Sequence, residues 1–184
     1  MKNKLIYLTG FMASGKSTVG PILANTIGWG FYDLDKLIEV ETSLSIKEIF
    51  KVHGESYFRK LETDVLKKVS LLNEFVISLG GGTIVDQENL KLIKGSGLLV
   101  YLESSPEAAY KRLRFKRDRP ALLFDGEDEP TEAEFINRIK SLLKNRLQYY
   151  NSADIKINTD NIPVGKTVDK LAEIIEKEFY GKTN

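Results

Sequence analysis

Short apolar runs alternate with amphipathic segments along most of this chain. Five such runs occupy residues 4–8, 30–34, 75–79, 98–102 and 154–158. Short runs separated by segments of helical period are typical of βαβ units, in which parallel strands form a sheet covered by helices. We therefore expect an α/β fold with a five-stranded, mainly parallel sheet between two layers of helices.

The segments between the runs carry helix start and stop signals. The spacing of Val19, Ile22, Leu23 and Ile27 predicts a helix after the first run, and Gly28 is expected to end it. After the fourth run, Ser105 followed by a proline is typical of an N-cap and first helical position. Residues 166–179 read as a terminal amphipathic helix.

Two capping boxes predict further helices. Ser45 with Glu48 opens a short helix that Gly54 is expected to end, and a second helix follows it over about residues 61–72. Thr131 with Glu134 opens another, which we expect to run unbroken towards residue 150. The stretch at 117–130 resembles a loose loop whose acidic centre, at 125–130, is too polar to pack, so we expect it to be a mobile lid.

Bulk composition excludes several classes of function. At 184 residues the chain is long enough for one domain with a small lobe. Its 27 basic and 26 acidic residues give no overall field for nucleic acid. It has no cysteine for a disulfide or thiolate site, and the single His53 cannot form a histidine-rich zinc site. No run approaches the roughly 18 apolar residues of a membrane span, and no signal peptide is expected. We expect a monomeric cytoplasmic enzyme that binds neither nucleic acid nor membrane.

The most specific local pattern follows the first run directly. Gly10, Gly15, Lys16 and Ser17 match the phosphate-binding loop G-x-x-x-x-G-K-[ST], between an expected strand and an expected helix. The glycines allow backbone N–H groups to converge on phosphate oxygens, and the helix adds its positive end. Lys16 is expected to reach the β- and γ-phosphates and Ser17 to ligate Mg²⁺. We predict that ATP contacts Gly10, Met12, Ala13, Ser14, Gly15, Lys16, Ser17 and Thr18.

Acidic residues at strand ends are candidates for holding the metal and orienting an acceptor. No D-x-x-G or N-K-x-D motif of a GTPase occurs, so the metal carboxylate must be sought elsewhere, at Asp33 or Glu103. Asp33 is favoured because Asp35 accompanies it. On an extended segment the two carboxylates would point the same way, with Asp33 on Mg²⁺ and Asp35 accepting a hydrogen bond from an acceptor hydroxyl. A capping aspartate at a strand-to-helix turn is the alternative.

Arginines and a glycine triplet describe the acceptor side. Arg59 lies three residues before Glu62 on one helical face, and Arg146 lies on the expected long helix. A guanidinium fork suits a carboxylate or a phosphate. Gly80, Gly81 and Gly82 would offer a substrate a wall without side chains. From the basic cluster at 112–119 we assign Arg119 to the moving phosphoryl group, where a lid arginine stabilises developing charge.

Together these motifs resemble the shikimate kinases over almost the whole chain. The likeness rests on the loop at 10–17, the pair Asp33 and Asp35, the stretch at 58–62, the triplet at 80–82, the segment at 119–122, and Arg146 four residues before a tyrosine. It implies ATP-dependent phosphorylation of the 3-hydroxyl of shikimate, with Mg²⁺. It also implies a P-loop NTPase fold like that of the nucleoside-monophosphate kinases, with strand order 2-3-1-4-5.

The resemblance further implies roles for individual residues. Asp35 would contact the reacting hydroxyl, Arg59 and Arg146 the shikimate carboxylate, and Gly80 to Gly82 the ring. A substrate-binding lobe would span about 33–61 and a lid about 113–128. Adenine would lie between Arg112 and the loop at 158–163, where the expected contacts are Asn158, Asp160 and Pro163.

Two alternatives remain at this stage. A kinase of the same fold could act on gluconate or on a nucleoside monophosphate, with the arginines holding a different anion. A nucleotide-dependent switch or binding module without a small acceptor belongs to another class, and the missing switch motifs count against it.

Overall fold

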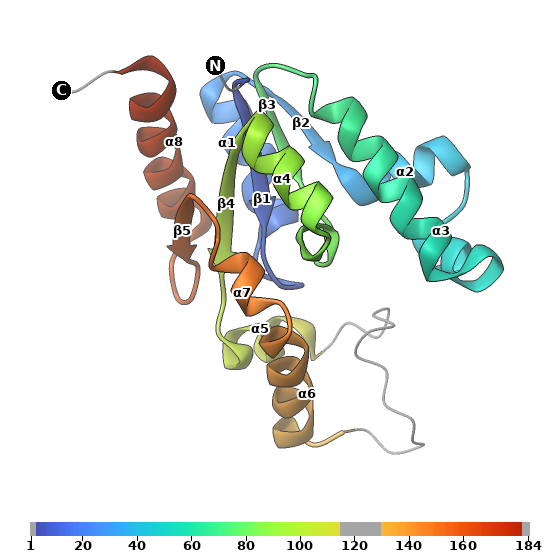
Figure 1. Cartoon of the computed structure of the whole chain (residues 1–184). Coiled ribbons are helices and arrows are strands. Elements are labelled where there is room, and N and C mark those ends of the chain that lie inside the picture. Colours follow the sequence, from blue (N-terminus) through green and yellow to red (C-terminus); the bar gives the residue numbers. More distant parts are fainter. Residues whose placement is uncertain (1–2, 115–129, 182–184) are drawn as a thin grey trace.

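A computed structural model describes residues 3–114 and 130–181, which form a parallel sheet between two layers of helices (Figure 1). The strands are β1 (Leu5–Thr9), β2 (Gly30–Asp33), β3 (Phe75–Ser78), β4 (Leu98–Glu103) and β5 (Ile155–Asn158). They lie in the order β2-β3-β1-β4-β5 and every neighbouring pair is parallel. The predicted fold class and strand order are confirmed, with strand bounds that differ by about one residue.

Helices connect the strands and cover both faces of the sheet. They are α1 (Lys16–Ile27), α2 (Leu34–Thr42), α3 (Ile46–Val69), the 3₁₀ turn η1 (Thr83–Val85), α4 (Gln87–Ser96), α5 (Pro106–Leu113), α6 (Glu132–Lys144), α7 (Leu147–Tyr150) and α8 (Val164–Tyr180). No helix among these described residues is long and apolar enough to cross a lipid bilayer.

The central strand β1 feeds two separate cores because its side chains alternate between the faces of the sheet. Leu5 and Tyr7 pack with apolar residues of α2, α3, α4 and α7, whereas Ile6 and Leu8 pack with residues of α1 and α8. All four side chains are fully buried. A strand buried on both faces reads as a continuous apolar run, which is why the sequence pattern located it.

The capping signals correctly mark several helix ends. Ser45 with Glu48, and Thr131 with Glu134, form complete capping boxes at the starts of α3 and α6. Ser105 caps α5, as expected. Gly54 has φ 80° and ψ 175° inside α3, so the helical path breaks at the residue that was expected to end it and resumes at a kink.

Two expectations about helices are wrong. The helix from Thr131 does not run unbroken towards residue 150: α6 ends at Lys144, and the Arg146 N–H donates to Leu143 O, three residues back, at 2.9 Å. Neither a glycine nor a proline marks this break, so no local signal announced it. Residues 33–35 were expected to be extended, with a capping Asp33 as the alternative, whereas α2 begins at Leu34. The helix at 87–96 was not predicted.

A third, smaller core joins the first loop to the base of the predicted lid. Phe11 packs with Ala109 and Leu113 of α5 and with Ile139 of α6. These two helices project below the sheet in Figure 1. Most of the segment at 113–128, including Arg119, lies outside the described residues.

Candidate active site

The loop between β1 and α1 takes a conformation that its glycines make possible. Gly10 has φ 147° and Gly15 has φ 105°, and a Cβ built on Gly10 would lie 2.5 Å from Leu102 O. Real side chains do not tolerate that contact. Ala13 also takes a positive φ of 59°. Strained backbone of this kind is characteristic of loops that present N–H groups to a ligand.

Lys16 and Ser14 line the inside of this loop. The Lys16 ammonium donates to the carbonyl oxygens of Gly10, at 2.8 Å, and Phe11, at 3.2 Å. The Ser14 hydroxyl is buried, and no residue within 3–114 or 130–181 forms a hydrogen bond with it. Because α1 begins at Lys16, the positive end of this helix faces the same loop. This arrangement suits an anion.

A cavity of about 300 Å³ adjoins the loop. Residues from three parts of the chain line it: Ala13, Ser14, Gly15, Lys16, Ser17, Thr18, Val19, Arg112, Thr159, Ile162, Val164 and Thr167. Arg112 closes one side, because its guanidinium donates to Ala13 O at 3.0 Å and to Thr159 O at 2.8 Å. The predicted loop residues from Ala13 to Thr18 and Arg112 therefore share one cavity. Thr159 and Ile162 lie within the loop at 158–163 that was expected beside adenine, although neither was named as a contact. Val19, Val164 and Thr167 were missed, because nothing in the local sequence distinguishes them.

The other three predicted adenine contacts, Asp160, Pro163 and Asn158, do not all lie at this cavity. The Asp160 carboxylate accepts from Ser104 Oγ, at 3.1 Å, and from the Ser105 N–H, at 3.0 Å. These hydrogen bonds hold the pKa of Asp160 below its usual value, although burial opposes them. Pro163 is exposed and precedes the first residue of α8. Asp160 and Pro163 thus bracket Ile162, which lines the cavity at the loop.

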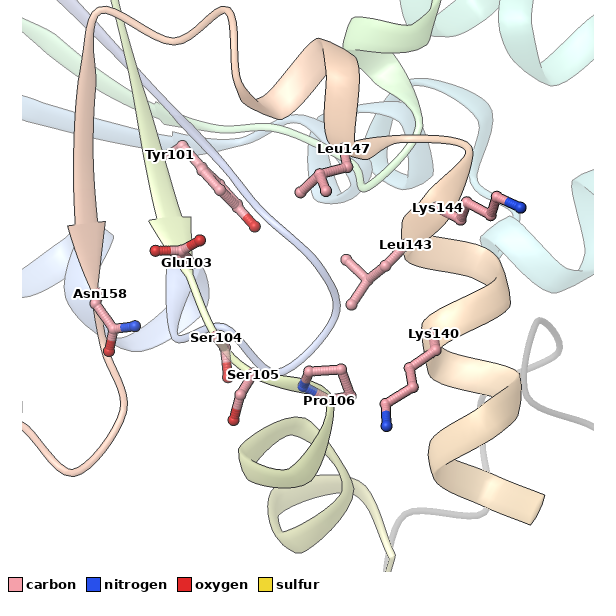
Figure 2. Close-up of a pocket in the computed structure, with 10 residues that line it drawn as sticks. All are labelled: Tyr101, Glu103, Ser104, Ser105, Pro106, Lys140, Leu143, Lys144, Leu147 and Asn158. Carbon is pink, nitrogen blue, oxygen red and sulfur yellow. The ribbon is translucent and has the colours of Figure 1, made fainter. Parts of the chain in front are cut away.

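Asn158 faces a different cavity. This second cavity, of about 450 Å³, lies between the end of β4, the start of α5 and the α6–α7 junction (Figure 2). Its lining includes Glu103, Lys140 and Leu147 but no residue of the loop at 10–18. Glu103, the alternative metal carboxylate, therefore lines a cavity to which that loop contributes no residue.

The glycine triplet after β3 brings the predicted acceptor residues together. A Cβ built on Gly80 would lie 2.9 Å from Asp35 Oδ1. One on Gly81 would lie 3.2 Å from Arg146 Nη1, and one on Gly82 would lie 2.9 Å from Arg59 Nη2. A carboxylate from α2 and two guanidinium groups, one from α3 and one from the α6–α7 junction, thus converge on a wall without side chains, and any Cβ there would crowd them.

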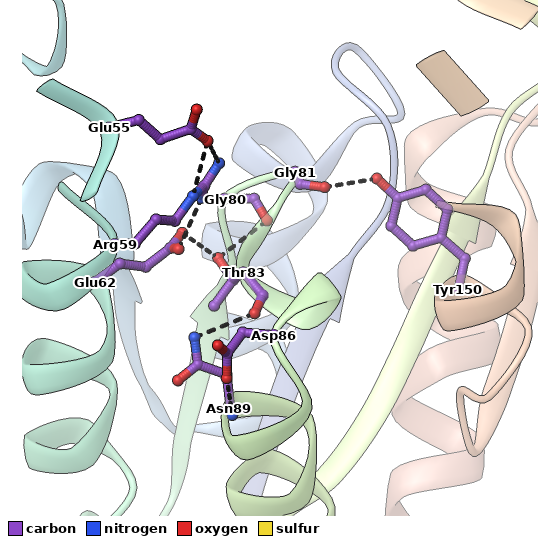
Figure 3. Close-up of polar contacts among 9 residues, drawn as sticks. All are labelled: Glu55, Arg59, Glu62, Gly80, Gly81, Thr83, Asp86, Asn89 and Tyr150. Atoms are coloured by element: carbon purple, nitrogen blue, oxygen red, sulfur yellow. Dashed lines mark hydrogen bonds and ion pairs between the residues drawn. The ribbon is translucent and has the colours of Figure 1, made fainter. Parts of the chain in front are cut away.

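A buried hydrogen-bond network supports this wall (Figure 3). Glu62, 1% exposed, accepts from Arg59 Nη1 at 2.8 Å and from Thr83 Oγ1 at 2.6 Å. The Asn89 amide donates to Thr83 O at 3.2 Å. From the opposite side, the Tyr150 hydroxyl donates to Gly81 O at 2.9 Å. Thr83 and Tyr150 were not predicted as site residues, because only the tertiary fold brings them to the triplet.

Asp35 is electrostatically unusual. Its pKa is raised to about 6: burial is the largest cause, the negative charges of Asp33 and Glu62 act in the same direction, and the positive charge of Lys16 opposes them. Its Oδ1 atom is buried and has no hydrogen-bond partner among the residues that the structure describes. An unpaired carboxylate oxygen that feels the phosphate-loop lysine is well placed to accept a hydrogen bond from a bound alcohol.

The two aspartates are not paired on an extended segment, and that expectation is wrong. Asp33 ends β2 and caps α2, accepting from the Lys36 N–H at 3.3 Å, while Asp35 lies in the first turn of α2. Aspartate favours the N-cap position, so a helix starts here, and the two carboxylates do not project in the same direction as they would on a strand. Their charges still influence one another.

The residues present fit a magnesium site of the kind that phosphates complete. No group of three or more acidic or histidine side chains that could hold a metal occurs within 3–114 and 130–181. Mg²⁺ usually retains several waters and takes only one or two protein ligands beside substrate phosphates. The exposed Ser17 hydroxyl at the start of α1 and the Asp33 carboxylate at the end of β2 are donors of the right kind.

The fold and this site define a P-loop phosphotransferase like the nucleoside-monophosphate kinases. A glycine-rich loop that suits an anion follows β1, and the glycine triplet follows the neighbouring strand β3. Comparison with known proteins narrows the class. Residues 12–176 match the family model described as shikimate kinase. A shikimate kinase of Chlorobium phaeobacteroides is 46% identical over 175 residues, which cover 95% of this chain and 92% of the relative.

Solved structures agree with this match. A shikimate kinase from Acinetobacter baumannii in complex with shikimate has a TM-score of 0.86 and 31% identity, covering 96% of this chain and 95% of that one. The shikimate kinase of Bacteroides thetaiotaomicron has a TM-score of 0.83 and 32% identity over 94% and 98% of the two chains. This chain belongs to the shikimate kinase family.

Proposed function

We infer that this protein transfers the γ-phosphoryl group of ATP to the 3-hydroxyl of shikimate, giving shikimate 3-phosphate and ADP. The observation that carries this conclusion is the convergence of Asp35, Arg59 and Arg146 on the glycine triplet, with Asp35 close enough to Lys16 to feel its charge. Family membership supports it, as does the relative that binds shikimate at the same fold.

On the acceptor side, the residues position a carboxylated alcohol. We assign Arg59 and Arg146 to the carboxylate of shikimate, and Gly80 to Gly82 to the face of its ring. Asp35 accepts the hydrogen bond of the reacting hydroxyl. Because phosphoryl transfer passes through a loose transition state that demands little proton abstraction, this aspartate contributes mainly by orienting the hydroxyl.

On the donor side, the loop from Gly10 to Thr18 cradles the phosphates of ATP and Lys16 stabilises the charge of the transferring group. Arg112, Asp160 and Pro163 are proposed for the adenine side, together with Asn158, which begins the same loop although its side chain lines the second cavity. Ser17 and Asp33 would hold Mg²⁺, which supplies charge neutralisation at the β- and γ-phosphates. Arg119 is proposed to stabilise the moving phosphoryl group, although it lies outside the described residues.

The remaining features of the proposal concern the whole protein. We propose a single domain over 1–184, with an acceptor-binding lobe at about 33–61 and a lid at about 113–128. We also propose that the enzyme works as a monomer in the cytoplasm.

A coupled assay of ADP formation tests the choice of acceptor. With magnesium and ATP present, shikimate should stimulate ADP release at least about a hundredfold over the acceptor-free rate, whereas gluconate, AMP and CMP should not, because only shikimate combines the ring, the carboxylate and the hydroxyl that the site arranges. Stimulation by gluconate or a nucleoside monophosphate instead would identify a different kinase of this fold. Equal hydrolysis with and without acceptors would indicate a switch module.

A further inference from the structure

The Arg59 guanidinium lies between two carboxylates that differ sharply in exposure (Figure 3). Glu62 is 1% exposed and accepts from Nη1 at 2.8 Å. Glu55 is 66% exposed and accepts from Nη2 at 3.1 Å and from Nε at 3.3 Å, both through Oε1. The two partners therefore occupy different edges of one guanidinium.

Glu62 is held in place by more than Arg59. Thr83 Oγ1 donates to its other carboxylate oxygen, and Asn89 in turn fixes the Thr83 carbonyl. Removing one partner of a buried ion pair leaves an uncompensated charge, so such pairs resist exchange. Glu62 is a fixed anchor for Arg59.

Glu55 has no comparable support among the described residues. Within the described part of the chain its carboxylate pairs with Arg59 alone, and its backbone follows the non-helical Gly54, where α3 kinks. Exposed ion pairs at this i,i+4 spacing are weak, since water competes for both partners. Glu55 can leave Arg59 at little cost.

The edge that Glu55 occupies is the one that a ligand carboxylate would use. The Nε and Nη2 donors of arginine form a fork that matches the two oxygens of a carboxylate. The same guanidinium lies against Gly82, at the proposed acceptor wall. Glu62 already takes Nη1, so an incoming carboxylate and Glu55 require the same pair of donors.

We propose that Glu55 is a displaceable placeholder: its carboxylate occupies Arg59 until the carboxylate of the acceptor replaces it, while Glu62 keeps the guanidinium aimed at the glycine wall. This inference rests on the proposed function, because it takes Arg59 to be the clamp for the shikimate carboxylate. The placeholder keeps Arg59 ordered and paired between turnovers. It also weakens acceptor binding, because the ligand must compete with a tethered anion.

Replacing Glu55 by glutamine tests the competition directly. Glu55→Gln keeps the size of the side chain and removes its charge. We expect the Kd of shikimate, measured by calorimetry, and its KM to fall by about two- to fivefold, the scale of a released exposed ion pair. The KM of ATP should stay unchanged.

A matched control and a modified ligand isolate the cause. Glu173 pairs with Lys177 on α8 at the same spacing and the same 3.1 Å distance, with 68% exposure, so Glu173→Gln should leave shikimate binding unchanged. The methyl ester of shikimate lacks the anionic carboxylate and should bind wild type and Glu55→Gln equally well.

The outcomes separate the placeholder from the proposed function. If wild type binds and phosphorylates shikimate but Glu55→Gln binds it no more tightly, or more weakly, the placeholder is overturned and the function stands. If Glu55→Gln tightens the ester as much as the acid, the competition is not for the carboxylate and the placeholder is overturned. If wild type neither binds nor phosphorylates shikimate, both are overturned.

Discussion

At the scale of one residue, Asp35 lowers the stability of the folded protein but provides a carboxylate for the proposed reaction. Its carboxylate is retained where burial and two neighbouring negative charges disfavour ionisation. A neutral residue of the same shape would fold there more easily. Placing a charge in such surroundings is typical of functional sites, because the same conditions that destabilise the ion make it an effective acceptor for a substrate hydroxyl.

Asp35→Asn should therefore stabilise the folded protein while reducing turnover. The pKa of Asp35 is about 6 in the folded state against an ordinary 3.8, so the folded state binds more protons between these values and loses stability as pH rises through them. At pH 7 the variant should gain up to about 3 kcal/mol in the free energy of unfolding. The gain should shrink towards zero at pH 4. Urea unfolding of both proteins at the two pH values measures this, and a gain that does not depend on pH would contradict the assignment.

At the scale of elements, the loop at 10–17 and the capping boxes were predictable because the physics that forms them is local. The glycine conformations and the Ser45–Glu48 box depend on residues a few positions apart. The start of α2 and the break before Arg146 were not predicted. At the start of α2, the Asp33 side chain caps the helix instead of continuing the strand. At the break, the Arg146 N–H donates to the carbonyl three residues back instead of four, and nothing in the sequence marks this change.

The break between α6 and α7 has a consequence for binding, because it lies where the Arg146 guanidinium meets Gly81. We expect Arg146→Ala to raise the KM for shikimate by tenfold or more with a much smaller effect on the KM for ATP, since a charge-assisted clamp on the carboxylate is lost. Steady-state kinetics with each substrate varied in turn measures the split.

Arg138→Ala, on the exposed surface of α6, provides the control for that experiment and should leave both constants unchanged. Equal increases in both KM values for Arg146→Ala would instead mean that Arg146 supports the fold of the site as a whole.

At the scale of the whole molecule, the strand order explains why donor and acceptor meet. β3 lies beside β1 with Leu8 opposite Ser78, so the loop that begins at Gly10 and the triplet that begins at Gly80 leave the sheet side by side. In open α/β sheets ligands bind outside the carboxyl ends of the strands. The sequence identified both glycine segments and the three-residue spacing that pairs Arg59 with Glu62. Thr83 and Tyr150 meet the triplet through tertiary packing, which no local pattern in the chain reveals.

The central claim is that these adjoining sites transfer a phosphoryl group from ATP to one particular hydroxyl. The most direct measurement is to incubate the protein with magnesium, ATP and shikimate and to locate the phosphate in the product by phosphorus–proton correlation NMR. The account predicts a single phosphate ester at the 3-hydroxyl, formed in equal amount to ADP. Inorganic phosphate beside unchanged shikimate, or an ester at another hydroxyl, would contradict it.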